Sequence, residues 1–126
     1  MITQRQNITI EFKEWKAEFK NYKDMTSSEK MDIIQKAVDN YIESYITYAN
    51  GSELTNLIQH KDHVVMIGTS IMATKWGIGW DGGSFVQAVV DNDLMGAVSR
   101  ADYINSQLLK FYCSLMYNMA MPDELN

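Results

Sequence analysis

Apolar residues recur at three- and four-residue spacing from residue 31 to residue 48, and this run limits the fold more than any other part of the chain. Such spacing is typical of a helix that packs one face against a core. Thr26 followed by Glu29 forms a capping box, which predicts that the helix begins directly after Thr26. Asn50 and Gly51 supply a left-handed stop at the other end. We therefore expect one long amphipathic helix here.

Further helical patterns follow along the chain, joined by short connections. Residues 64–78 include "VVMIG", which suits a strand, but their helical period holds longer and we favour a helix. Ser84 with Gln87 forms a second capping pattern and predicts another helix, and the last helix is expected over 104–119. Residues 8–12 alternate apolar and polar types like a short strand, while a helical stripe starts at their end, so strand and helix compete there.

These patterns predict an all-α (mainly α) protein built from antiparallel helical hairpins, with a short N-terminal strand as the one open alternative. The 126 residues suit a single domain. We expect N-terminal helices over 1–75, a glycine-rich joint over 76–83 and a C-terminal helical hairpin over 84–122. A single proline in the chain argues against a turn-rich β-sandwich.

The charge and composition of the chain disfavour some classes of binding partner. The net charge of −5 disfavours DNA or RNA duplex binding, which needs a basic surface. No apolar run approaches the ~20 residues of a membrane span, and the N-terminus has no signal pattern, so we expect a cytoplasmic protein that does not bind membranes. Cys113 is the only cysteine and lies in an apolar run, which predicts a buried thiol.

Gly77, Gly79 and Gly82 match the spacing G-x-G-x-x-G. A dinucleotide fingerprint needs a strand before the first glycine and a helix opening at the last. Here a helix is expected before the first glycine, and the next helix begins only after Gly83, so we interpret the match as chance. The amides of Gly83 and Ser84 at that helix start could instead bind an anion.

Two tryptophans, Trp76 and Trp80, flank the glycines and could stack on a base; the alternative is that both lie in the core and the glycines form a hinge. His60 and His63 share one helical face, but a metal site needs three or four ligands, so we expect no metal. No base is spaced to activate a nucleophile. We therefore predict a protein that is not an enzyme and holds no cofactor.

A further candidate site follows if residues 84–103 form one helix. Phe85, Asn92, Gly96 and Arg100 then lie on neighbouring turns. An aromatic ring, an amide, a gap and a guanidinium suit a phosphorylated base. The alternative is structural: Phe85 in the core, Asn92 as a helix cap, Gly96 at a helix crossing and Arg100 paired with an acidic neighbour. The sequence "DND" can also interrupt this helix.

The segment from Gly82 to Pro122 resembles a family of small helical proteins of phages and prophages. The similarity lies in "GGSFVQAVVDNDLMGAVSRADYIN" and "LMYNMAMP", which match the pattern G-G-x-F, N-D-L, R-A-D and Y-N before a closing proline. The resemblance implies a helical phage protein and no particular activity.

The front portion is similar, more loosely, to the helical hairpin of phage anti-CBASS and anti-Thoeris proteins, in "YKDMTSSEKMDIIQKAV" and "VVMIGTSIM". Those proteins sequester cyclic nucleotide immune signals as symmetric oligomers. Tyr22 and Lys36 are the nearest matches to a tyrosine and a lysine of that pattern, whereas Thr69 and Ser70 stand in place of an arginine–threonine pair. The resemblance implies a homo-oligomer that binds a cyclic nucleotide.

Together these interpretations predict a phage-encoded anti-defence protein that binds and sequesters a cyclic nucleotide immune signal in the host cytoplasm, without catalysis. Amides, guanidinium and ammonium groups would meet phosphate, and aromatic rings would stack on bases. The predicted ligand-binding residues are Tyr22, Lys36, Trp76, Trp80, Gly83, Ser84, Phe85, Asn92 and Arg100. Two alternatives stay open: an acidic helical inhibitor that binds a host defence protein, and a structural or assembly factor of the phage particle.

Overall fold

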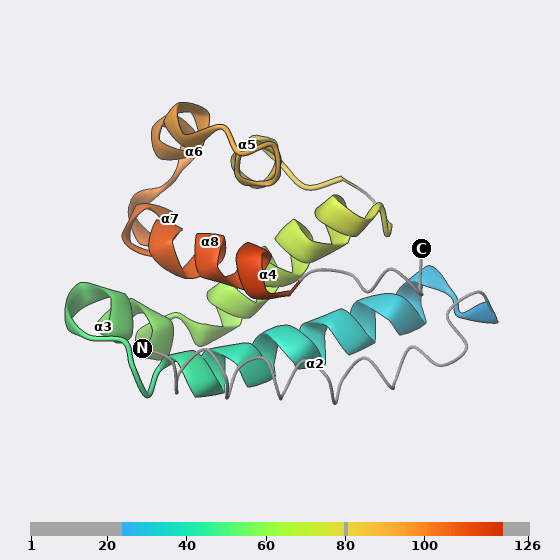
Figure 1. The fold of residues 1–126 in the computed structure, drawn as a ribbon, viewed down its shortest axis with the longest axis horizontal. Coiled ribbons are helices and arrows are strands. Elements are labelled where there is room, and N and C mark those ends of the chain that lie inside the picture. Colours follow the sequence, from blue (N-terminus) through green and yellow to red (C-terminus); the bar gives the residue numbers. More distant parts are fainter. Residues whose placement is uncertain (1–23, 80, 120–126) are drawn as a thin grey trace.

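The computed structural model describes residues 24–79 and 81–119, and these ranges contain seven α-helices and no strand. The predicted all-α class is thereby confirmed (Figure 1). The helices are α2 (Ser27–Tyr45), α3 (Gly51–Gln59), α4 (Lys61–Trp76), α5 (Ser84–Val90), α6 (Leu94–Arg100), α7 (Tyr103–Gln107) and α8 (Leu109–Asn118). The competing strand and helix at 8–12, together with Tyr22 and Trp80, lie outside the described residues.

Helix α4 is the centre of the arrangement, because it contacts α2, α3, α5 and α8. In Figure 1, α2 and α3 form the lower layer and α5 and α6 the upper one, with α4, α7 and α8 between them. Within the described ranges, no helix is both long and apolar enough to cross a membrane. The helix expected over 64–78 is confirmed as α4, and Gly77 ends it in a left-handed conformation with φ of 71°.

Helix α2 begins directly after Thr26, as the capping box predicts. Thr26 Oγ1 accepts the amide of Glu29 at 3.1 Å, and Glu29 Oε1 accepts the amide of Thr26 at 3.1 Å. The predicted end is wrong, because α2 stops at Tyr45 in a hydrogen-bonded turn. Gly51 does have a positive φ, 59°, but it begins α3, with Asn50 as the N-cap.

An aromatic cluster joins α2 to α8 in the core. The ring of Phe111 contacts Tyr41, Tyr45 and Tyr112 edge-on, with centroid distances of 5.8, 5.1 and 5.5 Å. Burial raises the pKa of Tyr41, Tyr45 and Tyr112, so these hydroxyls stay neutral well above neutral pH. The cluster therefore holds the long lower helix to the C-terminal part of the chain.

Gly68 lets α2, α4 and α8 approach closely. A Cβ atom at Gly68 would lie 2.9 Å from Val38 Cγ1 and 3.1 Å from Leu115 Cδ2. Cβ contacts in proteins are longer, so a side chain at this position requires Val38 and Leu115 to shift. The glycine is thus a packing residue of α4, within a stretch that sequence periodicity alone marks only as helical.

The region from Ser84 onward is not one helix, so the condition for the candidate stripe along residues 84–103 is not met. The chain turns at Asn92, which has a φ of 61°, and the Asp93 carboxylate caps α6 by accepting the amide of Gly96 at 2.9 Å. The predicted interruption at "DND" is confirmed. The predicted capping role of Ser84 is wrong, since Gly83 is the N-cap and the Gln87 side chain donates to the Gly82 carbonyl at 2.7 Å.

The last predicted helix also divides, into α7 and α8, at Leu108. Asp102 caps α7 by accepting the amide of Asn105 at 2.7 Å. Cys113 is exposed, so its predicted burial is wrong. The reason is helical geometry: Phe111, Tyr112 and Leu115 fill the buried face of α8, and residue 113 falls on the opposite side.

Candidate functional site

An open groove runs between α2 and α4, and we call it the α2–α4 groove. It has a volume of about 920 Å³, within the range of roughly 300–1,000 Å³ that ligand sites span. Its lining residues come from one face of each helix: Met31, Asp32, Gln35, Lys36, Asp39, Asp62, Val65, Met66, Thr69, Ser70 and Ala73. The groove is therefore lined by both apolar and charged side chains.

Negative charge dominates this lining, because Asp32, Asp39 and Asp62 outnumber the single cation, Lys36. Asp39 is engaged with Lys61, whose Nζ lies 3.1 Å from Asp39 Oδ1. Among the described residues, neither Asp32 nor Asp62 forms an ion pair. Two carboxylates of the groove are thus available to an incoming cation.

Lys61 is held at one end of the groove by two acidic side chains. Its ammonium group binds Glu43 as well as Asp39, and these hydrogen bonds raise the pKa of Lys61. The lysine therefore stays protonated at neutral pH. Lys61 forms ion pairs with Asp39 and Glu43. It does not neutralise the other two carboxylates of the groove, Asp32 and Asp62.

Thr69 adds a polar atom beneath the rim of the groove. The residue is 7% exposed, and no described residue forms a hydrogen bond with its Oγ1. Buried polar groups are nearly always paired, and leaving one unpaired costs about 1–3 kcal/mol. The hydroxyl is therefore a buried, unsatisfied polar group beside the groove.

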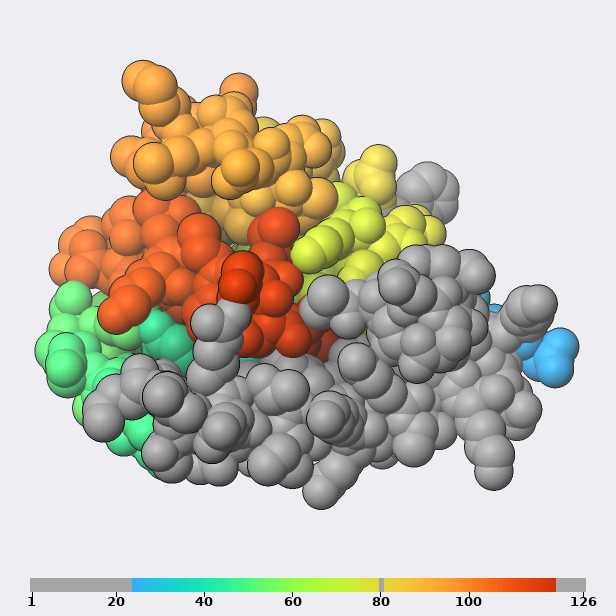
Figure 2. Space-filling view, viewed as in Figure 1, coloured from blue at the N-terminus to red at the C-terminus, as the bar shows by residue number. Residues whose placement is uncertain are grey.

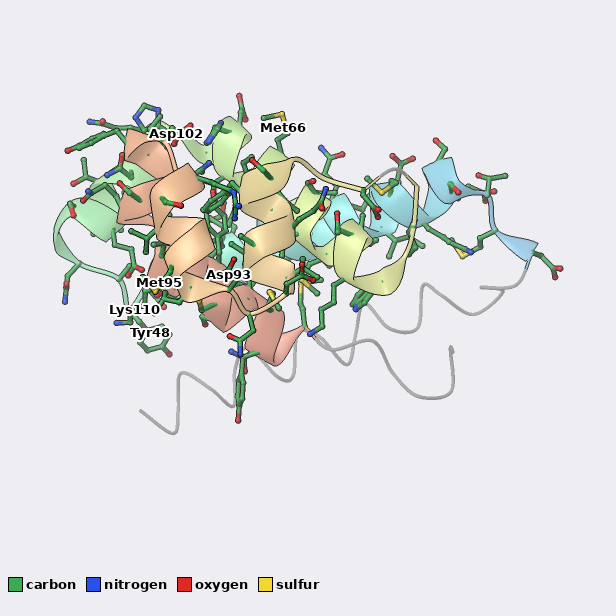
Figure 3. The ribbon with its side chains drawn as sticks, turned by 90° about the horizontal axis from the view of Figure 1, so that it is seen from above. Tyr48, Met66, Asp93, Met95, Asp102 and Lys110 are labelled. Carbon is green, nitrogen blue, oxygen red and sulfur yellow. The ribbon has the colours of Figure 1, made fainter. Side chains whose placement is uncertain are left out.

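A second, smaller depression lies beside the groove, between α4 and the start of α5. Its volume is about 380 Å³, and its lining residues are Met66, Ile67, Ser70, Gly83, Ser84, Phe85, Val86 and Asn105. It shares Met66 and Ser70 with the α2–α4 groove. Met66 is 60% exposed and projects from α4 at the edge of the molecule (Figure 3).

Four of the predicted ligand residues lie on this side of α4. Lys36 lines the α2–α4 groove, and Gly83, Ser84 and Phe85 line the smaller depression. The loop before Gly83 is bonded to α4, because the amide of Gly82 donates to Thr74 Oγ1 at 2.9 Å. Phe85 is 8% exposed and packs on the Tyr112 ring, so most of its surface belongs to the core.

The other described candidates lie elsewhere. Asn92 lies in the turn between α5 and α6, Arg100 is the last residue of α6, and neither lines a depression. Arg100 Nη1 lies 3.7 Å from Asp93 Oδ2, which matches the structural alternative for this arginine. Trp76 is half-buried at the end of α4. The structure thus does not assemble the predicted stripe of Phe85, Asn92 and Arg100 into one pocket.

Asn105 is a buried residue whose role the sequence analysis missed. It is 5% exposed, and its Oδ1 accepts the Tyr112 hydroxyl at 3.2 Å and lies 3.1 Å from His63 Nε2. His63 is therefore a partner of the core amide. Within the described part of the chain, no group of three metal-ligating side chains comes together.

Comparisons with protein-family models, curated proteins and solved structures found no match to the chain. The similarities to phage proteins therefore stay predictions. The function has to be argued from the two depressions beside α4 and from the charges that surround them.

Proposed function

We propose that the chain is a non-catalytic binding protein that holds a basic, amphipathic helical segment of another protein in the α2–α4 groove. One observation supports this proposal above all: exposed apolar side chains and two carboxylates that form no ion pair with a described residue line the same groove. Helices commonly bind partners in this way, with their apolar face in a groove.

The charges and the apolar side chains of the groove contribute differently to binding. Asp32 and Asp62 are exposed, so each ion pair with a lysine or arginine would contribute only roughly 0–1 kcal/mol. Their larger effect is on the association rate and on the choice of partner. Affinity would come from apolar burial against Met31, Val65 and Met66, and methionine adapts to partners of varied shape.

This function belongs to the class of acidic protein-binding inhibitors. Segments that bind nucleic acid are rich in lysine and arginine. A protein that covers such a segment would block its partner's access to nucleic acid with one-to-one stoichiometry. A host defence protein, such as a nuclease or effector, is the target class that we propose.

Calorimetric titration tests the proposal directly. The probe is a synthetic peptide helix with leucines on one face and lysines on the other, and the control peptide has the same composition in scrambled order. We expect the ordered peptide to bind more tightly. Asp32→Asn with Asp62→Asn should weaken binding, whereas the matched pair Asp24→Asn with Asp81→Asn should not. Equal losses in both double variants would show binding to net charge alone and contradict the proposal.

The predicted sequestration of a cyclic nucleotide is a second candidate. It is supported by Lys36 and the Gly83–Ser84 backbone, which line neighbouring depressions that share Met66 and Ser70. The three carboxylates of the groove oppose it, because they repel phosphate. A thermal-shift panel of cyclic di- and trinucleotides tests this candidate. Stabilisation that Lys36→Gln abolishes would favour it over the peptide-binding function.

A further inference from the structure

Asn50 and Gly51 lie where the connection from α2 enters α3, which is drawn in green at the left edge of the molecule (Figures 1 and 2). They are the one asparagine–glycine pair in the sequence. An asparagine side chain can react with the backbone nitrogen of the next residue, and glycine there has no side chain to hinder the approach. Neither residue lines a depression beside α4, so this chemistry is separate from the proposed function.

The side chain of Asn50 is exposed and is not held by a hydrogen bond. Asn50 is the N-cap of α3, a position at which an asparagine side chain commonly accepts an amide of the first turn. Here that bond is absent, and no other described residue bonds the side chain. The side chain can therefore rotate toward its own backbone.

The backbone amide of Gly51 has no hydrogen-bond partner either. The first amides of a helix have no acceptor within the helix, and no other described group accepts this one. Gly51 has a φ of 59°, and nothing lies within 4 Å of the position that a Cβ atom would take. The nitrogen can therefore lose its proton, and the space beside Gly51 is open.

The pair Asp81 and Gly82 shows the contrasting case. Asp81 is also exposed and also precedes a glycine, but the amide of Gly82 donates to Thr74 Oγ1 at 2.9 Å. An amide in such a bond keeps its proton, and its nitrogen is engaged with Thr74. In the described part of the chain, an exposed side chain and an unbonded glycine amide therefore occur together at Asn50.

We propose that Asn50 is a site of spontaneous deamidation and isomerisation. The deprotonated Gly51 nitrogen attacks Asn50 Cγ, a C–N bond closes a succinimide ring, and the side-chain nitrogen leaves as ammonia. Water then opens the ring. Attack of water at Cγ gives aspartate, whereas attack at the backbone carbonyl carbon gives isoaspartate, in which the main chain runs through Cγ. Water is the only co-reactant.

The two products should differ in stability, because the start of α3 is bonded to other helices. The Tyr45 hydroxyl donates to Glu53 Oε2 at 3.0 Å, and Ser52 Oγ donates to Gln107 Oε1 at 3.0 Å. Isoaspartate lengthens the main chain directly before these residues and should displace them from their partners. Aspartate leaves the main chain unchanged and adds negative charge at the N-terminus of α3, where the helix dipole favours it.

Peptide mapping by mass spectrometry tests the proposal on the full, folded chain after incubation at neutral and mildly alkaline pH. Among the described asparagines, Asn50 should convert fastest, and its rate should rise with pH because the attacking nitrogen must lose a proton. Asn50→Gln should abolish conversion at this position over the same period, since the longer side chain closes a ring far more slowly. If Asn50 stays intact in the folded chain but converts in urea, the fold protects it and the proposal is overturned.

Thr74→Val tests the role of the glycine amide. In the wild type, isoaspartate should not accumulate at Asp81, because the Gly82 amide is bonded to Thr74. The variant frees that amide and should raise isoaspartate at Asp81 several-fold, while conversion at Asn50 stays unchanged. Equal accumulation at Asp81 in both proteins would show that amide bonding does not control the reaction, and would contradict the argument from Gly51.

Asn50→Asp reproduces one of the two products and tests the predicted difference in stability. Its urea midpoint should equal or exceed that of the wild type, whereas incubated wild type that contains isoaspartate should unfold at lower urea. Equal midpoints for the fresh and the isoaspartate-containing chains would contradict the predicted loss of bonds at the start of α3. Asn50→Asp should leave calorimetric binding of the lysine–leucine peptide unchanged, because Asn50 lies outside the α2–α4 groove, so this proposal and the proposed function can fail separately.

Discussion

Asp93 and Arg100 lie at opposite ends of α6 and meet across it, with Arg100 Nη1 3.7 Å from Asp93 Oδ2. The same carboxylate accepts the amide of Gly96 and so caps the helix. A Cβ atom at Gly96 would collide with both side chains, so glycine leaves the space in which they meet. The N-D-L and R-A-D segments thus have structural roles at the two ends of α6.

Asp93→Ala should lower the free energy of unfolding by about 1 kcal/mol, because the amide of Gly96 loses its cap. Asp93→Asn should retain most of that stability, since an asparagine side chain caps a helix without the charge. Urea unfolding measures both. Equal losses in the two variants would assign the stabilisation to the ion pair with Arg100 instead.

Gly68→Ala should destabilise the fold by about 1–3 kcal/mol through overpacking against Val38 and Leu115. The sign is informative, because glycine-to-alanine changes inside a helix normally stabilise it by up to about 1 kcal/mol. Combining Gly68→Ala with Val38→Ala gives the control. The double variant should lose less than the sum of the single losses, and strict additivity would rule out the close approach.

Some parts of the fold can be predicted from the sequence and others cannot. The capping box at Thr26 and the period of α2 are local, so the start of that helix is predictable. The break at Asn92 depends on one left-handed residue inside an otherwise helical pattern, and only the "DND" composition hints at it. The requirement for glycine at position 68 arises from α2 and α8, which lie far away in sequence.

The candidate site is less predictable than the fold. Lys36 was singled out from a resemblance, but the carboxylates that surround it come from both α2 and α4 and meet only after folding. Phe85 and Asn105 have ordinary sequence surroundings, and their burial depends on Tyr112 of α8. Cys113 was predicted to be buried but is exposed. Apolar neighbours in sequence do not identify which side of a helix is buried.

Thr69→Val and Thr74→Val make the same chemical change and should have opposite effects. Thr69→Val removes a buried hydroxyl without a described partner, so stability should rise, by up to about 1–3 kcal/mol. Thr74→Val removes the acceptor of the Gly82 amide and should lower stability by about 1 kcal/mol. Thermal or urea unfolding compares them. A destabilised Thr69→Val would show that its hydroxyl already has a partner.

Stability should fall at alkaline pH because of the buried tyrosines. The pKa of Tyr41, Tyr45 and Tyr112 is raised in the folded state, mainly by burial. Above about pH 10 the unfolded chain releases these protons while the folded chain keeps them, so unfolding becomes more favourable as pH rises. The stabilisation is complete below that pH. Unfolding free energies measured from pH 8 to 11 test this slope.

Tyr112→Phe should flatten that alkaline slope, although it also removes the hydrogen bond to Asn105 and lowers stability at neutral pH. Tyr103→Phe, at a residue 75% exposed, is the matched control and should leave the slope unchanged. An unchanged slope in Tyr112→Phe would show that this hydroxyl ionises equally in both states.

Arg100→Ala separates the structural function of this arginine from the predicted phosphate contact. Its ion pair with Asp93 is half exposed and loose, so its loss should change the unfolding free energy by less than about 1 kcal/mol. Peptide binding in the α2–α4 groove should be unchanged, because Arg100 does not line it. If cyclic nucleotide sequestration is the function, the same variant should instead abolish nucleotide binding while the chain stays folded. Calorimetry with peptide and nucleotide, alongside urea unfolding, therefore shows whether Arg100 is a structural residue of α6 or a ligand residue.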